Sequence, residues 1–135
     1  GGVHIPAPFG EDGHSDGDVL IHAVIDALLG AARLGDIGLH FPPSDPKYKD
    51  ISSRVLLRKT AELVRDAGFS VGNLDCTVVL ERPKILPWRE AIIAALAEDL
   101  ETSPGAISVK GKTKERVDAV GEGRAVEAYA SVLLA

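Results

Sequence analysis

The feature that most constrains the fold is an apolar segment over residues 18–33 whose ionisable side chains lie on a single stripe. Before Arg33 these side chains are Asp18, His22 and Asp26, which recur every four residues. A four-residue step in an α-helix advances by only about 40° beyond one full turn, so the three side chains share one narrow face. Because the remaining faces are apolar, other elements must cover them. The segment therefore predicts a buried helix.

The composition sets the class of protein around this helix. A chain of 135 residues with 45% hydrophobic and 26% charged residues is typical of one globular domain, here residues 1–135. A formal net charge of -5 and only 4% aromatic residues argue against a nucleic-acid partner. The longest nearly apolar run, residues 19–32, is too short to span a bilayer. The single cysteine, Cys76, favours a reducing compartment such as the cytoplasm.

The order of the remaining elements follows from periodicity and from glycine and proline positions. After the first helix, which Gly35 ends, residues 35–50 predict a long loop, and long loops in compact domains are usually functional. The predicted order is strand, helix, helix, strand, helix, strand, strand, which favours an α/β (α+β) domain with a mixed sheet and helices packed on one face. Further helices are expected from Ser52 or Ser53 to Gly68 and over residues 88–100, and strands at residues 3–5, 71–80, 107–110 and 125–134.

Three sets of inward-facing residues are expected within these elements. A helix buries positions three and four apart, and a strand buries alternate positions. Pro87 suits the first position of the third helix. The final strand carries small and apolar residues on both faces. The expected inward residues are Val55, Leu56, Lys59, Leu63 and Val64 in the second helix, Leu74, Cys76, Val78 and Leu80 in the first long strand, and Ile92, Ile93, Leu96 and Leu100 in the third helix.

The helical stripe carries the strongest chemical signal. His22 lies one turn from a carboxylate on each side, which favours a ligand role over that of a core histidine with satisfied hydrogen bonds. His14 extends the stripe at the helix entry. Ser15 and Asp18 are equally compatible with a purely structural role, because they resemble a capping box and suit the helix dipole.

Three loop segments carry weaker signals. Asp36 lies between Gly35 and Gly38, where a ligand could approach the backbone closely. The segment 83–87 joins a strand end to a helix start, where free backbone amides can bind a base or a phosphate. The turn 111–115 places Thr113 and Glu115 among lysines, a combination suited to a metal-bound phosphate. Each of these segments, taken alone, is also compatible with an ordinary solvated turn.

Taken together and in order, the motifs resemble a known family over the whole chain. They are GGVHIP at residues 1–6, HSDGDVLIHAVIDALLGAARLGDIG at 14–38, FPPSDPKYKDISSR at 41–54, GNLDCTVVLERPKILP at 72–87, EDL at 98–100 and GKTKE at 111–115. This pattern is similar to that of the 2-C-methyl-D-erythritol 2,4-cyclodiphosphate synthases of the non-mevalonate isoprenoid pathway. The block at residues 14–38 is much longer and more specific than a short motif.

The resemblance implies a homotrimer with active sites at the subunit boundaries and two metal ions. His22 matches a zinc ligand of the family, and Glu115 matches the ligand of a magnesium or manganese ion that bridges the diphosphate. His14 and Ser15 match residues beside the 2-phosphate of the substrate, and Asp36 matches the carboxylate that receives the methylerythritol hydroxyls. Asp26 matches a fixed aspartate near the substrate. The cytidine and its phosphates are expected at Pro83, Lys84, Ile85, Leu86 and Thr113, and the residues expected to support catalysis are Asp36, Thr113 and Glu115.

The implied reaction is an intramolecular phosphoryl transfer that releases CMP from a small cytidine diphosphate substrate. Two departures from the family pattern stand out. The strand with the Asp-x-His zinc ligands is expected before Gly1, and His4 does not replace it. The segment between Glu115 and the GEG turn is shorter, which affects residues expected at the trimer axis. Two alternatives remain open: a catalytically impaired trimeric module that binds a nucleotide or a hydrophobic ligand, and a metal-dependent phosphohydrolase.

Overall fold

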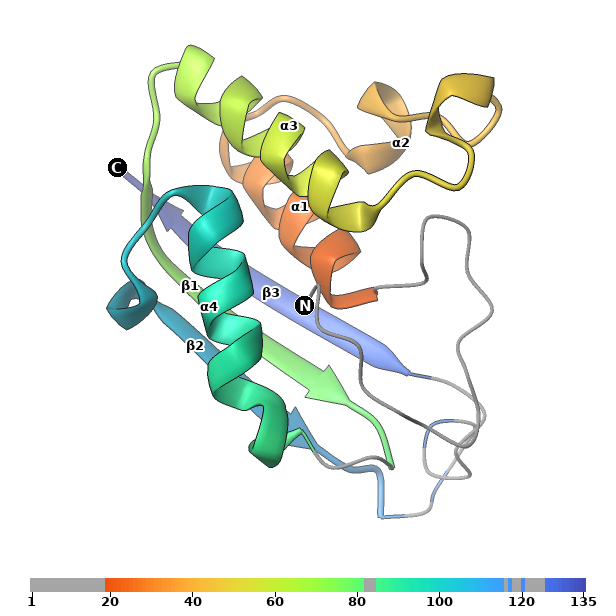
Figure 1. The fold of residues 1–135 in the computed structure, drawn as a ribbon, viewed down its shortest axis with the longest axis vertical. Coiled ribbons are helices and arrows are strands. Elements are labelled where there is room, and N and C mark those ends of the chain that lie inside the picture. Colours follow the sequence, from red (N-terminus) through yellow and green to blue (C-terminus); the bar gives the residue numbers. More distant parts are fainter. Residues whose placement is uncertain (1–18, 82–84, 116, 118–119, 121–125) are drawn as a thin grey trace.

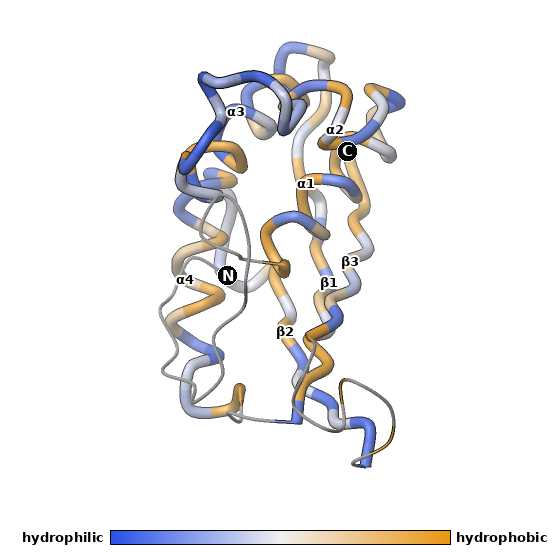
Figure 2. The backbone as a smooth tube through the Cα atoms, turned by 90° about the vertical axis from the view of Figure 1, so that its right-hand side faces the viewer, coloured by the Kyte–Doolittle hydropathy of each residue, from blue (hydrophilic) through white to orange (hydrophobic). Residues whose placement is uncertain are grey.

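The structure, a computed structural model, describes residues 19–81, 85–115, 117, 120 and 126–135. In this part of the chain, helices lie on one face of a three-stranded sheet (Figure 1; Figure 2). The first strand expected, at residues 3–5, lies outside the described residues, as do Ser15 and Asp18, which resemble a capping box in the sequence. The main elements are α1 (Val19–Ala31), α2 (Ile37–His40), α3 (Ser53–Asp66), β1 (Val71–Val79), α4 (Arg89–Leu100), β2 (Ile107–Lys112) and β3 (Glu127–Leu134).

The sheet is mixed, as expected, with β1 at its centre. β1 pairs with β2 in parallel and with β3 antiparallel, so Leu74 lies opposite both Ile107 and Val132. Leu74, Cys76 and Val78 are buried, which confirms the predicted alternation as far as Val78. It ends there, because Val79 is buried as well and Leu80, expected to face inward, is half-buried. β2 runs two residues beyond the expected range because Lys112 still pairs with β1.

The packing of helix α1 explains why its sequence is apolar on most faces. It packs against β3 on one side and against α3 on the other, so two surfaces of one helix are covered. Full burial of a leucine or isoleucine contributes about 1.5–3 kcal/mol to folding, which makes this helix a main source of stability. Its buried residues are Leu20, Ile21, Val24, Ile25, Leu28 and Leu29.

Helix α3 begins where the sequence predicts, but its buried face is rotated. Ser52 caps it by accepting a hydrogen bond from the Arg54 backbone N–H. The expectation that Lys59 faces inward is wrong, because Lys59 is exposed and Thr60 is buried in its place. The reason is that α3 contacts both α1 and α4, which turns a different stripe inward. The buried residues are Ser53, Leu56, Leu57, Thr60, Ala61 and Val64.

The expected long loop at residues 35–50 contains two short helical segments, α2 and a 3-10 turn over Pro46–Tyr48. Aspartate starts both of them: Asp36 accepts a hydrogen bond from Leu39 N, and Asp45 accepts one from Lys47 N. A cap that satisfies a free N–H allows a single turn to form without a hydrophobic stripe. The loop prediction was therefore too coarse at these two places.

Helix α4 follows a 3-10 turn, Leu86–Trp88, so Pro87 lies in that turn and not at the first position of the α-helix. Ile92, Leu96 and Leu100 are buried as expected, while Ile93 is half-buried.

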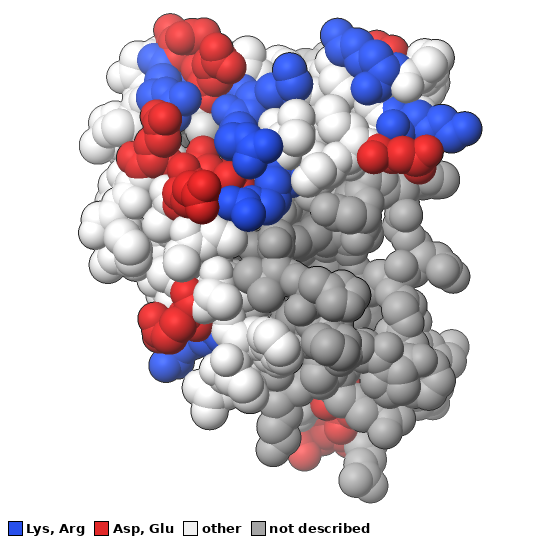
Figure 3. Space-filling view, in the orientation of Figure 1, with Lys and Arg blue, Asp and Glu red and all other residues white. Residues whose placement is uncertain are grey.

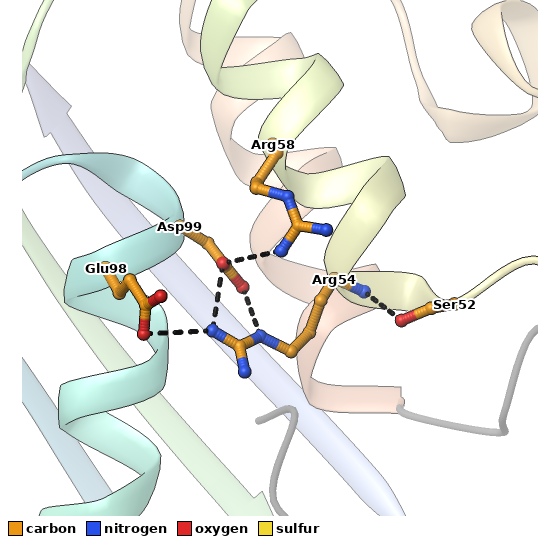
Figure 4. Close-up of polar contacts among 5 residues, drawn as sticks. All are labelled: Ser52, Arg54, Arg58, Glu98 and Asp99. Atoms are coloured by element: carbon orange, nitrogen blue, oxygen red, sulfur yellow. Dashed lines mark hydrogen bonds and ion pairs between the residues drawn. The ribbon is translucent and has the colours of Figure 1, made fainter.

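An ion-pair cluster joins the end of α4 to the start of α3 (Figure 4). Arg54 donates two hydrogen bonds to Asp99, from Nε to Oδ2 at 2.7 Å and from Nη2 to Oδ1 at 3.0 Å. Arg58 adds a third, at 3.1 Å. The Asp99 side chain is 1% exposed, so its charge is compensated inside the protein. Elsewhere over α3 and the end of α4, acidic and basic side chains are intermixed at the surface (Figure 3).

Candidate functional site

A cavity of about 570 Å³ lies where β1 and β2 end, next to the start of α4. Its size is within the usual range for small-molecule sites. Two segments expected to bind substrate meet here, Ile85–Leu86 before α4 and Thr113–Glu115 after β2; Pro83 and Lys84 lie outside the described residues. The lining residues are Leu80, Glu81, Ile85, Leu86, Arg89, Val109, Lys110, Gly111, Lys112, Thr113 and Glu115.

The cavity combines an apolar part with charged groups. Aliphatic side chains just after β1, on β2 and in the segment before α4 supply the apolar part. Arg89, Lys110 and Lys112 supply three cations, against the two carboxylates Glu81 and Glu115. Lys110 is paired with Asp75 on the neighbouring strand at 2.9 Å. Such a lining suits a ligand with a flat, weakly polar ring and an attached anionic group.

Glycine at position 111 allows the cavity wall to form. A Cβ atom built on Gly111 would lie 3.1 Å from Ile85 Cβ, closer than ordinary van der Waals contact. Ile85 therefore packs directly over the backbone of β2. The close approach brings the segment before α4 against the strand that carries Lys110 and Lys112.

The turn after β2 holds Glu115 in a left-handed backbone conformation, with φ 52°. The Glu115 backbone N–H donates to Thr113 Oγ1 at 3.4 Å. A left-handed non-glycine residue costs of order 1 kcal/mol or more and is often found at functional sites. Both side chains are exposed. The Glu115 carboxylate is an oxygen donor of the kind that magnesium and manganese prefer, so it fits the expected second metal.

Glu81 was not anticipated from the sequence. Its Oε2 atom is buried and has no hydrogen-bond partner in the part of the chain that the structure describes. A buried acceptor without a donor is costly, and this one belongs to a residue that lines the cavity. A ligand with an N–H group or a bound cation would satisfy it. Glu81 falls within the motif at residues 72–87, but neither periodicity nor that motif singles it out, because its role depends on tertiary position.

Asp26 and Asp36 form a second group, at the end of α1. Asp26 Oδ1 accepts a hydrogen bond from the Ile37 backbone N–H at 2.8 Å. Asp36 Oδ1 accepts one from Leu39 N at 2.9 Å as the cap of α2. Both carboxylates are exposed. Asp26 thus fixes the segment that follows Asp36, and each carboxylate keeps its second oxygen for other contacts.

His22 lies earlier on α1, half-buried, with its Nε2 atom 3.1 Å from Ser53 Oγ. An imidazole with one nitrogen held by a neighbouring oxygen is a common arrangement for a metal ligand. Among the described residues, however, no three histidine, cysteine, aspartate or glutamate side chains gather into a metal-binding cluster. The His22 imidazole has the chemistry of a zinc ligand, but the described residues do not complete a three-ligand site around it. His14 and Ser15, expected nearby, lie outside the described residues.

The cavity residues and the Asp26–Asp36 group lie in different parts of the chain's fold. The cavity is at the end of the sheet where β1 and β2 finish, whereas Asp36 is at the start of α2, beyond the far end of α1 (Figure 1). Thr113 and Glu115 are brought together with Ile85 and Leu86, but not with Asp36.

Comparison with known proteins gives consistent matches. A relative in Solibacter usitatus, named 2-C-methyl-D-erythritol 2,4-cyclodiphosphate synthase, is 52% identical over 134 residues, covering 99% of this chain and 84% of the relative. A relative of that name in Oryza sativa subsp. japonica, described as chloroplastic, is 48% identical, covering 99% of this chain and 60% of the relative. A solved structure of 2C-methyl-D-erythritol-2,4-cyclodiphosphate synthase with CDP bound has a TM-score of 0.85 and 40% identity, covering 97% of this chain and 85% of that one.

Two further findings complete the comparison. Within the described residues, every helix is too short or too polar to cross a membrane. The model of the YgbB family matches residues 1–135. This match and the relatives' names agree with the resemblance seen in the motifs, and the chain belongs to the YgbB family.

Proposed function

We propose that this chain is a cyclodiphosphate synthase that converts 4-diphosphocytidyl-2-C-methyl-D-erythritol 2-phosphate to 2-C-methyl-D-erythritol 2,4-cyclodiphosphate and CMP. The observation that carries the proposal is the cavity at the ends of β1 and β2, lined by Ile85, Leu86, Thr113 and Glu115. A solved structure with CDP bound shares the fold at 40% identity, and the relatives bear the name of this activity.

The reaction is a displacement at phosphorus. An oxygen of the 2-phosphate attacks the β-phosphorus of the diphosphate, and a new P–O bond closes the ring. The bond from the β-phosphorus to the oxygen that bridges to the α-phosphorus breaks, and its electron pair leaves with CMP. Such a step needs positioning and charge neutralisation more than proton transfer.

The cavity residues have distinct tasks in this proposal. Ile85 and Leu86, with Pro83 and Lys84, enclose the cytosine ring. Thr113 donates a hydrogen bond to the diphosphate, and Lys112 and Arg89 add positive charge beside it. Glu115 would hold a magnesium or manganese ion, which supplies neutralisation of the phosphate oxygens. An acidic protein can bind a polyanion in this way because its carboxylates hold cations.

The second group of residues takes the other end of the substrate. Asp36 accepts hydrogen bonds from the methylerythritol hydroxyls, and Asp26 keeps the Asp36 segment in place through its bond to Ile37 N. His14 and Ser15 bind the 2-phosphate. His22 would supply one nitrogen to a zinc ion, which would polarise phosphate oxygens.

The distance between the two groups in one subunit supports a site shared between subunits, and hence a homotrimer. The outer face of β3 carries Tyr129 and Leu133, which are 60% and 67% exposed in the single chain. Apolar side chains of this size on an uncovered sheet face favour burial against another subunit. Sedimentation of the protein in dilute buffer should give the mass of three chains; a monomer that still binds CMP would contradict the shared site.

A cytoplasmic location is proposed from the single cysteine, although the rice relative is described as chloroplastic.

The deciding experiment measures CMP release and inorganic phosphate release from the authentic substrate. A cyclodiphosphate synthase releases CMP and no phosphate, a phosphohydrolase releases phosphate, and a binding module releases neither. Glu115→Gln should abolish stimulation by magnesium while CMP still binds, because the amide keeps the size of the side chain and removes its charge.

A further inference from the structure

The contact between His22 on α1 and Ser53 on α3 joins two residues that are 31 positions apart in the sequence. Ser53 is the first residue of α3 and is 0% exposed. Its hydroxyl is not needed to cap the helix, because the neighbouring Ser52 accepts the bond from Arg54 N at 3.2 Å. The two adjacent serines therefore make different contacts. Ser52 caps α3, and Ser53 contacts His22 on α1.

The start of α3 is held firmly at this place. Arg54, next to Ser53, makes its two hydrogen bonds to Asp99 on α4. Fork-shaped pairs between a guanidinium and a carboxylate fix orientation as well as distance. The hydrogen bond to Asp99 also raises the pKa of Arg54, so Arg54 stays charged at any working pH. Consequently the backbone that carries Ser53 is held in place beside His22.

We propose that Ser53 is a positioning residue for zinc: it accepts a hydrogen bond from His22 Nε2–H and so directs Nδ1 to the metal. A neutral imidazole binds a metal through one nitrogen, and the partner of the other nitrogen sets both the tautomer and the ring orientation. The inference rests on the proposed function in one respect, the role of His22 as a zinc ligand. It adds a residue outside the motif block at residues 14–38.

The test compares Ser53→Ala with Thr60→Val in the full-length protein. Both variants remove one buried hydroxyl from α3, but Thr60 Oγ1 donates to Leu56 O within its own helix at 2.9 Å. Thr60→Val therefore controls for the loss of a buried hydroxyl and for any general loosening of α3. Circular dichroism establishes that both variants are folded.

Two measurements report on the His22 ring besides activity. The first is the affinity for Zn²⁺ alone, obtained by competition with a chromogenic chelator. Loss of such a partner commonly weakens metal binding by roughly 10- to 100-fold, and we expect this for Ser53→Ala and no change for Thr60→Val. The second is the ¹⁵N spectrum of the metal-free protein at about pH 8, where free imidazole is neutral. The His22 Nε2–H proton should be protected from solvent exchange in the wild type and in Thr60→Val, and lost in Ser53→Ala.

The outcomes separate this inference from the proposed function. If Ser53→Ala binds zinc as tightly as the wild type while His22→Ala does not, Ser53 has no positioning role. Equal weakening by Ser53→Ala and Thr60→Val would also overturn it, because the effect would then be general. If the wild type binds no zinc, the ligand role of His22 fails and the positioning role fails with it. Titration with CMP tests the nucleotide cavity independently, since neither serine nor histidine lines it.

Discussion

Gly111 and Ile85 lie so close together that a single added methyl group would press on the wall of the nucleotide cavity. The two residues come from different elements, β2 and the turn before α4, and a Cβ atom on Gly111 would lie 3.1 Å from Ile85 Cβ. The contact sets how far the Ile85–Leu86 segment can move towards Lys112. Cavity width is thus determined by a residue with no functional group.

We expect Gly111→Ala to weaken CMP binding about fivefold, because overpacking of this kind costs about 1 kcal/mol and Ile85 must shift to relieve it. Isothermal calorimetry with CMP measures the change. Gly30→Ala is the matched control: a Cβ atom at Gly30 would meet nothing within 4 Å, and alanine at this position in α1 should stabilise the helix by roughly 0.5–1 kcal/mol. Unchanged CMP affinity in Gly111→Ala would mean that Ile85 does not form the wall.

The ion-pair cluster between α3 and α4 predicts that substitutions of two adjacent acidic residues change the free energy of unfolding by very different amounts. Asp99→Asn should lower the free energy of unfolding by about 2–3 kcal/mol, because it weakens charge-assisted hydrogen bonds to two arginines in a buried place. Glu98→Gln should cost well under about 1 kcal/mol, since Glu98 is 79% exposed and lies 3.4 Å from Arg54. Urea unfolding monitored by circular dichroism compares the two. Equal losses would show that burial does not govern this cluster.

The elements that could be predicted from the sequence are those whose signal is local. Helix α1 lies within two residues of its expected range at each end, and strand β1 begins at the expected residue and ends one residue early, because periodicity and glycine positions determine them. Lys59 was misplaced, because which stripe of α3 faces inward depends on its docking against both α1 and α4. A single-turn helix such as α2 has no periodicity to detect, and only its Asp36 cap could have indicated it.

For the candidate site too, the residues could be predicted in part from the sequence, but their arrangement could not. Ile85, Leu86, Thr113 and Glu115 could be selected from their motifs, but no sequence pattern indicates that they line one cavity. That arrangement depends on the parallel pairing of β1 with β2, which places both strand ends side by side. Ser53 is similar: its sequence context marks a helix start, and only the packing of α3 on α1 brings its hydroxyl to His22.

His22→Ala should abolish cyclisation while leaving the fold intact. The variant removes a proposed zinc ligand and the contact with Ser53, but alanine is the better helix former. The net change in unfolding free energy should therefore stay within about 1 kcal/mol. CMP release measures activity and circular dichroism measures folding. Full activity in a folded His22→Ala protein would remove His22 from the metal site.

The buried thiol of Cys76 makes stability fall at high pH. Burial, with the neighbouring charge of Asp75, raises the pKa of Cys76 from 9.0 to about 12. Between these values the unfolded chain has lost the thiol proton while the folded chain still holds it, so rising pH favours the unfolded state. The contribution of Cys76 is complete below about pH 9 and is lost towards pH 12, at roughly 1.4 kcal/mol per pH unit.

Cys76→Ala isolates this effect. Other groups also titrate at high pH, among them Tyr129, whose pKa is raised by its hydrogen bond to Glu127, but they are common to both proteins. The free energy of unfolding, measured in urea from about pH 8 to pH 10.5, should fall more steeply in the wild type than in the variant. Native protein should also resist thiol reagents near neutral pH, because the reactive species is the thiolate. Parallel pH curves for the two proteins would mean that water reaches Cys76 in the folded state.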